Sequence, residues 1–114
     1  TGQNTVFCYT SDHGEFLGSH GRSERKEHPH EESVRVPLVL HPPGRIAAQG
    51  WREEGLIALV DLMPTVMGLC GLPVPGWMQG QDCSAAAARG EGPLPKVQLL
   101  EMHNNPRWNL DYMD

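Results

Sequence analysis

The fold is restricted most strongly by a short apolar run that ends at a polar turn. Residues 5–10 are β-branched, aromatic or small, and they predict a buried β-strand. Ser11-Asp12-His13-Gly14 follow at once, and this tetrapeptide is typical of a turn. Polar residues just past the end of a buried strand are where α/β sheets place their ligands. The pattern therefore predicts a candidate site at Asp12 and His13.

Two further strands are expected along the chain. Residues 34–41 form an apolar run in which Pro37 should lie at a sheet edge or near the start of the strand. Residues 96–102 predict a last strand. The polar stretch from 15 to 33 should run over the surface or over an active site.

A helix is predicted over residues 62–70. Asp61 is expected to be its N-cap, Pro64 to lie in its first turn, and Gly71 to follow its end. Its broad apolar face indicates a packing element without chemistry. Residues 85–88 predict one further helical turn.

Composition excludes several classes of protein. A formal net charge of −5 argues against a nucleic-acid partner, because phosphates are neutralised by clustered Lys and Arg. Each apolar stretch is too short to span a membrane. Cys8, Cys70 and Cys83 are too scattered for a disulfide framework or a metal site, and the first two are expected in the core.

Asp12 and His13 are the candidate metal ligands. An adjacent Asp and His after a strand can offer an oxygen and a nitrogen to a divalent cation. Lys26 could fold back to hold an anionic oxygen, which would suit phosphoryl or sulfuryl transfer. The alternatives are a turn in which Asp12 caps the backbone and a surface role for Lys26.

Four segments in order resemble the sulfatase family, and together they cover about residues 4 to 82. The strand ending in Ser-Asp-His-Gly comes first, and Lys26 is followed by Glu-Glu-Ser-Val-Arg-Val-Pro at residues 31–37. Next comes an Asp-x-x-Pro-Thr helix from Asp61, and then a Gly-Leu-Pro segment with its loop at residues 71–80. Residues 83–114 lie outside the resemblance, and residues 1–114 are interpreted as part of a sulfatase catalytic domain.

The resemblance implies an alkaline-phosphatase-like α/β fold, with a mixed, largely parallel sheet flanked by helices and only partly present here. It implies that Asp12 is a metal ligand and that His13 binds the metal or touches the sulfate. Lys26 would contact the sulfate ester and help neutralise the leaving oxygen. The implied cation is Ca²⁺, with Mn²⁺ and Mg²⁺ as alternatives. Histidine is a poor match for calcium, which keeps the softer Mn²⁺ open.

Other residues of these motifs have secondary roles in this interpretation. His20 and His28 are expected near the active site. Glu31, Glu32 and Arg35 are expected to form a charge network that fixes the loop on the strand.

Two departures from the family pattern bear on function. The interval from Asp12 to Lys26 is about one residue longer than usual, so Arg25 could take the role of the lysine. The 114 residues also contain no Cys/Ser-x-Pro/Ala-x-Arg, the family's source of a formylglycine nucleophile. The chain is therefore predicted to be an inactive fragment of an enzyme that hydrolyses sulfate esters.

Two alternatives remain. One is a phosphonate monoester hydrolase or phosphodiesterase of the same superfamily. The other is a non-catalytic module that retains the fold. The sequence yields no prediction of compartment or oligomeric state.

Overall fold

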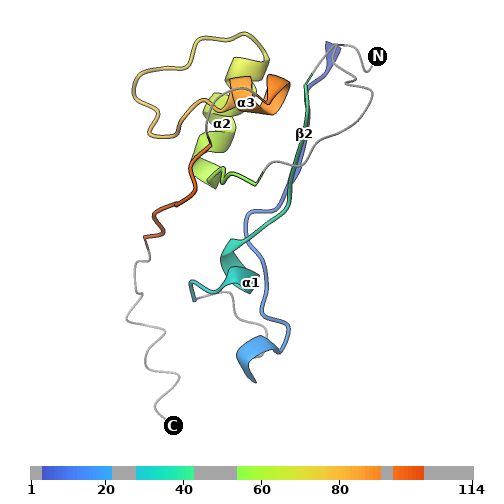
Figure 1. Cartoon of the computed structure of the whole chain (residues 1–114), viewed down its shortest axis with the longest axis vertical. Helices are drawn as coiled ribbons and strands as arrows, with labels where there is room; N and C mark the ends of the chain where they lie inside the picture. The colour runs from blue at the N-terminus through green and yellow to red at the C-terminus, as the bar shows by residue number, and fades with distance from the viewer. Residues whose placement is uncertain (1–3, 22–27, 43–53, 91–93, 102–114) are drawn as a thin grey trace.

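The computed structural model describes residues 4–21, 28–42, 54–90 and 94–101. Within these residues the chain forms two short strands, a 3-10 turn and three helices (Figure 1). Figure 1 shows α2 and α3 to one side of the strand pair, with α1 beyond one end of it. In chain order the elements are β1 (Phe7–Thr10), η2 (Ser19–Gly21), α1 (Glu31–Val34), β2 (Leu38–His41), α2 (Leu59–Leu69) and α3 (Ser84–Arg89).

The two strands pair in antiparallel register, with Phe7 opposite His41 and Thr10 opposite Leu38. A mixed, largely parallel sheet is therefore not seen in the described residues, whose single sheet has two strands. The first strand is shorter than predicted, and it is exposed where burial was expected. Phe7 and Tyr9 are 55% and 57% exposed, because no described element covers the face of the strand that they share.

The second strand also begins later than predicted. Val34 ends α1, so only Leu38–His41 of the predicted 34–41 segment is a strand. Pro37 directly precedes β2, as expected for a residue that cannot donate to a ladder.

Helix α2 begins three residues before the predicted start at Leu62. Its N-cap is Ala58, and Asp61 is the third residue of the helix, where its Oδ2 accepts the Ala58 N–H at 3.0 Å. The prediction that Asp61 is the N-cap was therefore wrong. Pro64 consequently lies in the helix interior, where it is buried.

The end of α2 confirms the predicted role of Gly71. This glycine has a φ of +70°, and its N–H donates to the Gly68 carbonyl at 3.0 Å. The Leu72 N–H donates to the Met67 carbonyl at 2.9 Å. These two bonds form a Schellman motif, which satisfies carbonyls that the helix leaves open.

The loop between α2 and α3 is held by two buried polar side chains of α2. Asp61 Oδ1 accepts the Gln81 N–H at 2.8 Å, and Thr65 Oγ1 accepts the Cys83 N–H at 3.0 Å. Burial, and then the nearby Asp61 carboxylate, raise the pKa of the Cys83 thiol. The Asp82 carboxylate accepts the N–H of Ser84, the first residue of α3, at 2.8 Å. Residues 85–88 lie in α3, which confirms the predicted helical turn.

Two predictions about the core and the C-terminal segment were wrong. Residues 96–101 form no strand, and Met102 lies outside the described residues. Cys8 and Cys70 are exposed, whereas Cys83 is buried. Burial in the described part of the chain instead centres on Phe16 and on the α2–α3 contact.

Candidate functional site

The loop that follows β1 is shaped by its own side chains. The Ser11 hydroxyl donates to the His13 carbonyl at 2.8 Å, and the His13 N–H donates to Asp12 Oδ1 at 3.0 Å. These local bonds turn the chain as soon as the strand ends. Asp12 and His13 are thereby presented together at that end of β1.

The Nδ1 atom of His13 lies 2.8 Å from the Gly14 carbonyl oxygen, and this contact favours one tautomer of the neutral ring. A carbonyl only accepts, so Nδ1 carries the proton and Nε2 of the neutral ring has a lone pair. Nε2 lies 3.6 Å from Asp12 Oδ2, and the two side chains are 37% and 84% exposed. An imidazole nitrogen and a carboxylate oxygen thus converge at a solvent-accessible point.

Gly14 joins this loop to α1. Its N–H donates to the Ser33 carbonyl at 2.7 Å. A Cβ at this position would collide with the carbonyl of Glu32. Gly14 therefore permits a close approach that any larger residue would prevent.

The predicted site is only partly within the described residues. Lys26 and its alternative, Arg25, lie outside them. No group of three or more His, Cys, Asp or Glu side chains in residues 4–21, 28–42, 54–90 and 94–101 is arranged to hold a metal ion. Asp12 and His13 form a pair of possible donors, and no third such side chain joins them among the described residues.

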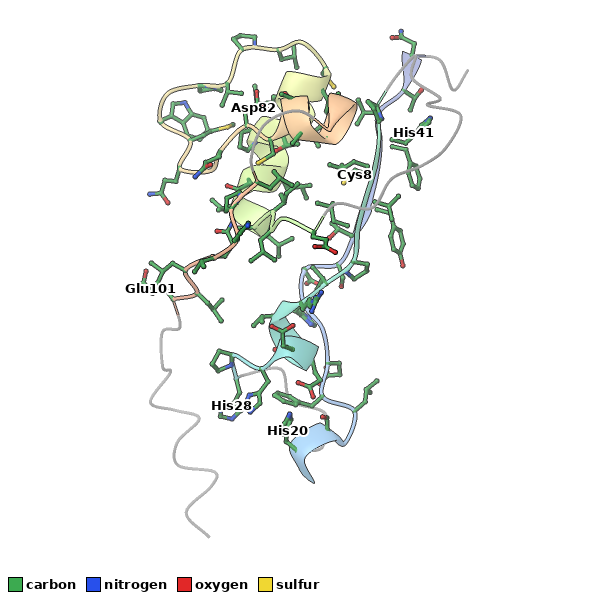
Figure 2. The ribbon with its side chains drawn as sticks, in the orientation of Figure 1. Cys8, His20, His28, His41, Asp82 and Glu101 are labelled. Atoms are coloured by element: carbon green, nitrogen blue, oxygen red, sulfur yellow. The ribbon has the colours of Figure 1, made fainter. Side chains whose placement is uncertain are left out.

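Beside this loop, a second cluster gathers His20 and His28. Figure 2 shows these two side chains at the same end of the molecule. The Phe16 ring is buried, and its centroid lies 6.3 Å from that of each. The His30 ring lies 4.7 Å from that of His20. Among the described residues, Nδ1 of His30 is the one buried side-chain nitrogen or oxygen without a hydrogen-bond partner.

The expected charge network divides into two parts. Arg35 pairs with Glu31 at 3.2 Å on the exposed side of α1. Glu32 instead accepts the Ser19 hydroxyl at 2.6 Å and lies 3.1 Å from His20 Nε2. The Ser19 hydroxyl first, then its own backbone and His20, lower the pKa of Glu32.

Sequence reasoning missed the contacts that Glu32 makes with Ser19 and His20. The residues are 13 and 12 positions apart, so no local periodicity connects them. The signal that was available is the pair Gly18 and Gly21, which both adopt positive φ in the turn that Glu32 holds. Glycines on both sides of a polar pair indicate a tight turn with positive φ, although they do not identify its distant partner.

None of the helices in the described part of the chain has the length and hydropathy of a membrane span.

Comparison with known proteins relates residues 1–72 to the family model described as Sulfatase. The endo-4-O-sulfatase of Bacteroides thetaiotaomicron is 39% identical over 70% of this chain and 16% of its own length. The iduronate 2-sulfatase of Mus musculus is 38% identical over 63% of this chain and 17% of its own. The N-acetylglucosamine-6-O-sulfatase of B. thetaiotaomicron is 40% identical over 81% and 16%.

Two solved structures are also similar. One is a protein in complex with its substrate D-glucosamine-2-N,6-O-disulfate, with a TM-score of 0.71, 31% identity and coverage of 91% of this chain and 21% of that one. The other is a phosphonate monoester hydrolase from Silicibacter pomeroyi, with a TM-score of 0.66, 27% identity and coverage of 80% and 17%. The chain thus spans about a sixth of the length of the curated relatives named above. The match of the family model over more than half of the residues shows that the chain belongs to the sulfatase family.

Proposed function

We propose that these residues are part of a sulfuric ester hydrolase and that Asp12 and His13 are two of the ligands of its divalent cation. The observation that carries the proposal is the convergence of His13 Nε2 and Asp12 Oδ2 at 3.6 Å, directly after β1. The proposal includes a longer catalytic domain with a mixed, largely parallel sheet, to which β1 and β2 contribute.

The two side chains fit a divalent cation by their chemistry. The bond from His13 Nδ1 to the Gly14 carbonyl leaves Nε2 as the ligand atom, and such outer contacts commonly orient metal-binding histidines. Asp12 is exposed enough to swing toward a cation. A bound divalent cation would polarise a sulfate oxygen and stabilise negative charge there. Calcium is proposed, with Mn²⁺ and Mg²⁺ as alternatives, and the nitrogen ligand favours Mn²⁺ among them.

Lys26 is proposed to contact the sulfate ester. A lysine ammonium is a compact positive charge, and it would neutralise charge that develops on the leaving oxygen. A formylglycine nucleophile, if present, is supplied from outside these 114 residues, which contain no Cys/Ser-x-Pro/Ala-x-Arg. The chain alone is therefore expected to show no turnover of an aryl sulfate ester, and hydrolysis by the purified chain would contradict this.

Two other functions are weighed against this proposal. Similarity to a phosphonate monoester hydrolase keeps that activity as the second candidate. The named sulfatase relatives favour sulfate esters, and the names of two of them direct the first assays to sulfated uronic acids and amino sugars. A non-catalytic module is the third candidate, and the absence of cation binding would favour it.

The test compares Lys26→Ala with Arg25→Ala in the enzyme that contains these residues. Lys26→Ala should lower kcat on a sulfate ester by about 100- to 1000-fold, the usual loss when one charge-stabilising group is removed. Arg25→Ala removes a neighbouring charge and should change kcat little. The reverse ranking would assign the role to Arg25, and a wild-type preference for phosphonate monoesters would overturn the sulfatase proposal.

A further inference from the structure

The side chain of Glu32 links α1 to the turn at residues 17–21. Its Oε1 accepts the Ser19 hydroxyl at 2.6 Å and lies 3.1 Å from His20 Nε2. Ser19 and His20 belong to η2, and Figure 2 shows His20 projecting from that element near His28. One carboxylate oxygen thus holds two consecutive residues of the turn.

The backbone of this turn needs such support. Leu17 and His20 have φ values of +47° and +56°, in the left-handed region that side chains disfavour. Residues held there cost of order 1–3 kcal/mol each, and they persist where the surroundings fix them. Leu17 is 81% exposed and offers little packing. The turn is held by burial of Phe16, by the Ser19 N–H bond to the Phe16 carbonyl at 2.8 Å, by the His20–His30 ring contact and by the two contacts of Glu32.

The backbone of α1 also fixes the loop at residues 11–14, which contains Asp12 and His13. The carbonyl of Glu32 lies where a Cβ of residue 14 would be, and the next carbonyl accepts the Gly14 N–H at 2.7 Å. Gly14 in turn supplies the carbonyl that bonds His13 Nδ1 at 2.8 Å. A short series of contacts therefore runs from the Glu32 side chain to the imidazole whose Nε2 faces Asp12.

We propose that Glu32 is a positioning residue for the Asp12–His13 pair, acting through the turn at residues 17–21 and through the α1 backbone. This inference rests on the proposed function, because it concerns the cation that Asp12 and His13 would bind. The Glu32 carboxylate fixes α1 against the turn, and α1 fixes Gly14 and the orientation of the His13 ring. Loss of the carboxylate lets α1 shift, so the two donor atoms converge less often.

The experiment measures Ca²⁺ binding to the enzyme that contains these residues, by isothermal titration calorimetry on the metal-free protein. Glu32→Ala should weaken Ca²⁺ binding about 10-fold, the lower end of the loss when an outer contact of a metal site is removed. Activity should fall at low Ca²⁺ and largely return at saturating Ca²⁺. Damage that is merely structural would not be rescued in this way.

Glu31→Ala is the matched control. Glu31 precedes Glu32 in the same helix, but its carboxylate pairs with Arg35 in solvent, with side-chain exposures of 74% and 71%. Its removal should leave Ca²⁺ affinity unchanged within about 2-fold, because exposed ion pairs contribute little. Equal affinities of the Glu32→Ala and Glu31→Ala proteins would overturn the inference.

Ser19→Ala provides a second variant in case Glu32→Ala does not fold. It breaks the 2.6 Å bond from the other side and should weaken Ca²⁺ binding about 3-fold, since the carboxylate still faces His20. An unchanged affinity in Ser19→Ala would then count against the inference. If the wild-type enzyme hydrolyses no sulfate ester, the proposed function fails, while the difference in Ca²⁺ affinity between the variants still decides the role of Glu32.

Discussion

The two halves of the molecule use an aspartate in opposite ways. In the half that contains β1 and α1, Asp12 is 84% exposed and accepts bonds only from its immediate neighbours among the described contacts. In the half that contains α2 and α3, Asp61 is 4% exposed and both of its oxygens accept backbone N–H groups. The same side chain therefore stabilises the fold in one region and remains available for a ligand in the other.

The difference follows from what surrounds each carboxylate. A buried carboxylate is tolerated only when donors satisfy it, and Asp61 receives them from Ala58 and Gln81. Asp12 is exposed to solvent, and the side chain that faces it is the His13 imidazole. Exposure alone does not distinguish Asp12, because most aspartates are exposed, and its candidate role depends on the His13 imidazole beside it.

Replacing Asp12 should give the largest effect. In the enzyme that contains these residues, Asp12→Ala is expected to lower sulfate ester hydrolysis by more than about 100-fold, since loss of outer metal contacts alone costs about 10- to 100-fold. Because the side chain is exposed, the free energy of unfolding should change by no more than about 0.5 kcal/mol. Parallel assays and urea unfolding measure both quantities. A variant that keeps its activity would remove Asp12 from the site.

Replacing Asp61 should give the opposite result. Asp61→Ala leaves the N–H groups of Ala58 and Gln81 without their acceptor, at a cost of about 2–4 kcal/mol of stability. The kcat of the molecules that remain folded should stay close to that of the wild type. Urea unfolding measures the loss of stability, and kcat corrected for the folded fraction shows whether the folded molecules keep their activity. A large loss of kcat with unchanged stability would show that the two regions do not differ as described.

Replacing Gly14 should lower both stability and activity, because this residue supports the fold and also lies in the candidate site. Gly14→Ala places a Cβ against the Glu32 carbonyl, and the shift this forces should cost about 1–3 kcal/mol. It should also lower activity, since the Gly14 carbonyl orients His13. Gly76→Ala is the control, because a Cβ at residue 76 meets no atom within 4 Å and its φ is not in the left-handed region. Loss of stability without loss of activity would show that the contact between Gly14 and α1 has no influence on the site.

Local signals in the sequence predicted the parts of the fold that depend on neighbouring residues. Gly71 ends α2 because a residue with positive φ is needed there, and glycine adopts it without cost. Pro37 precedes β2 because it cannot donate to the ladder. Ser11 to Gly14 form the turn after β1 through bonds within the tetrapeptide and to Ser33.

Features that depend on distant partners were not predictable in this way. The apolar pattern of residues 5–10 predicted burial, yet exposure is decided by what covers the strand and not by the strand itself. Residues 96–101 have strand composition, but a strand also needs a partner with open N–H and C=O groups. Asp61 was assigned as a cap on its residue type, whereas it reaches back from the third position of the helix to the Ala58 N–H.

The same distinction between neighbouring and distant partners applies to the candidate site. Asp12 and His13 are adjacent, so the sequence alone could place them together. Glu32 could be recognised as part of a motif, but its contacts with Ser19 and His20 cross 13 and 12 residues. Lys26 lies outside the described residues, so its role remains a prediction from the resemblance.

The smallest effect is expected at Thr65, and it tests whether hydrogen bonding or packing dominates in the α2–α3 region. The Thr65 side chain is fully buried, and its Oγ1 accepts the Cys83 N–H at 3.0 Å. Thr65→Val keeps the volume but leaves that N–H unsatisfied, at about 1–3 kcal/mol. Thr65→Ser keeps the hydroxyl and loses one methyl group, which costs about 0.8 kcal/mol. If urea unfolding shows Thr65→Val to be the less stable of the two, the hydroxyl holds the loop before α3. If Thr65→Ser is the less stable, packing of the methyl group dominates, and the contrast with Asp12 would then rest on Asp61 alone.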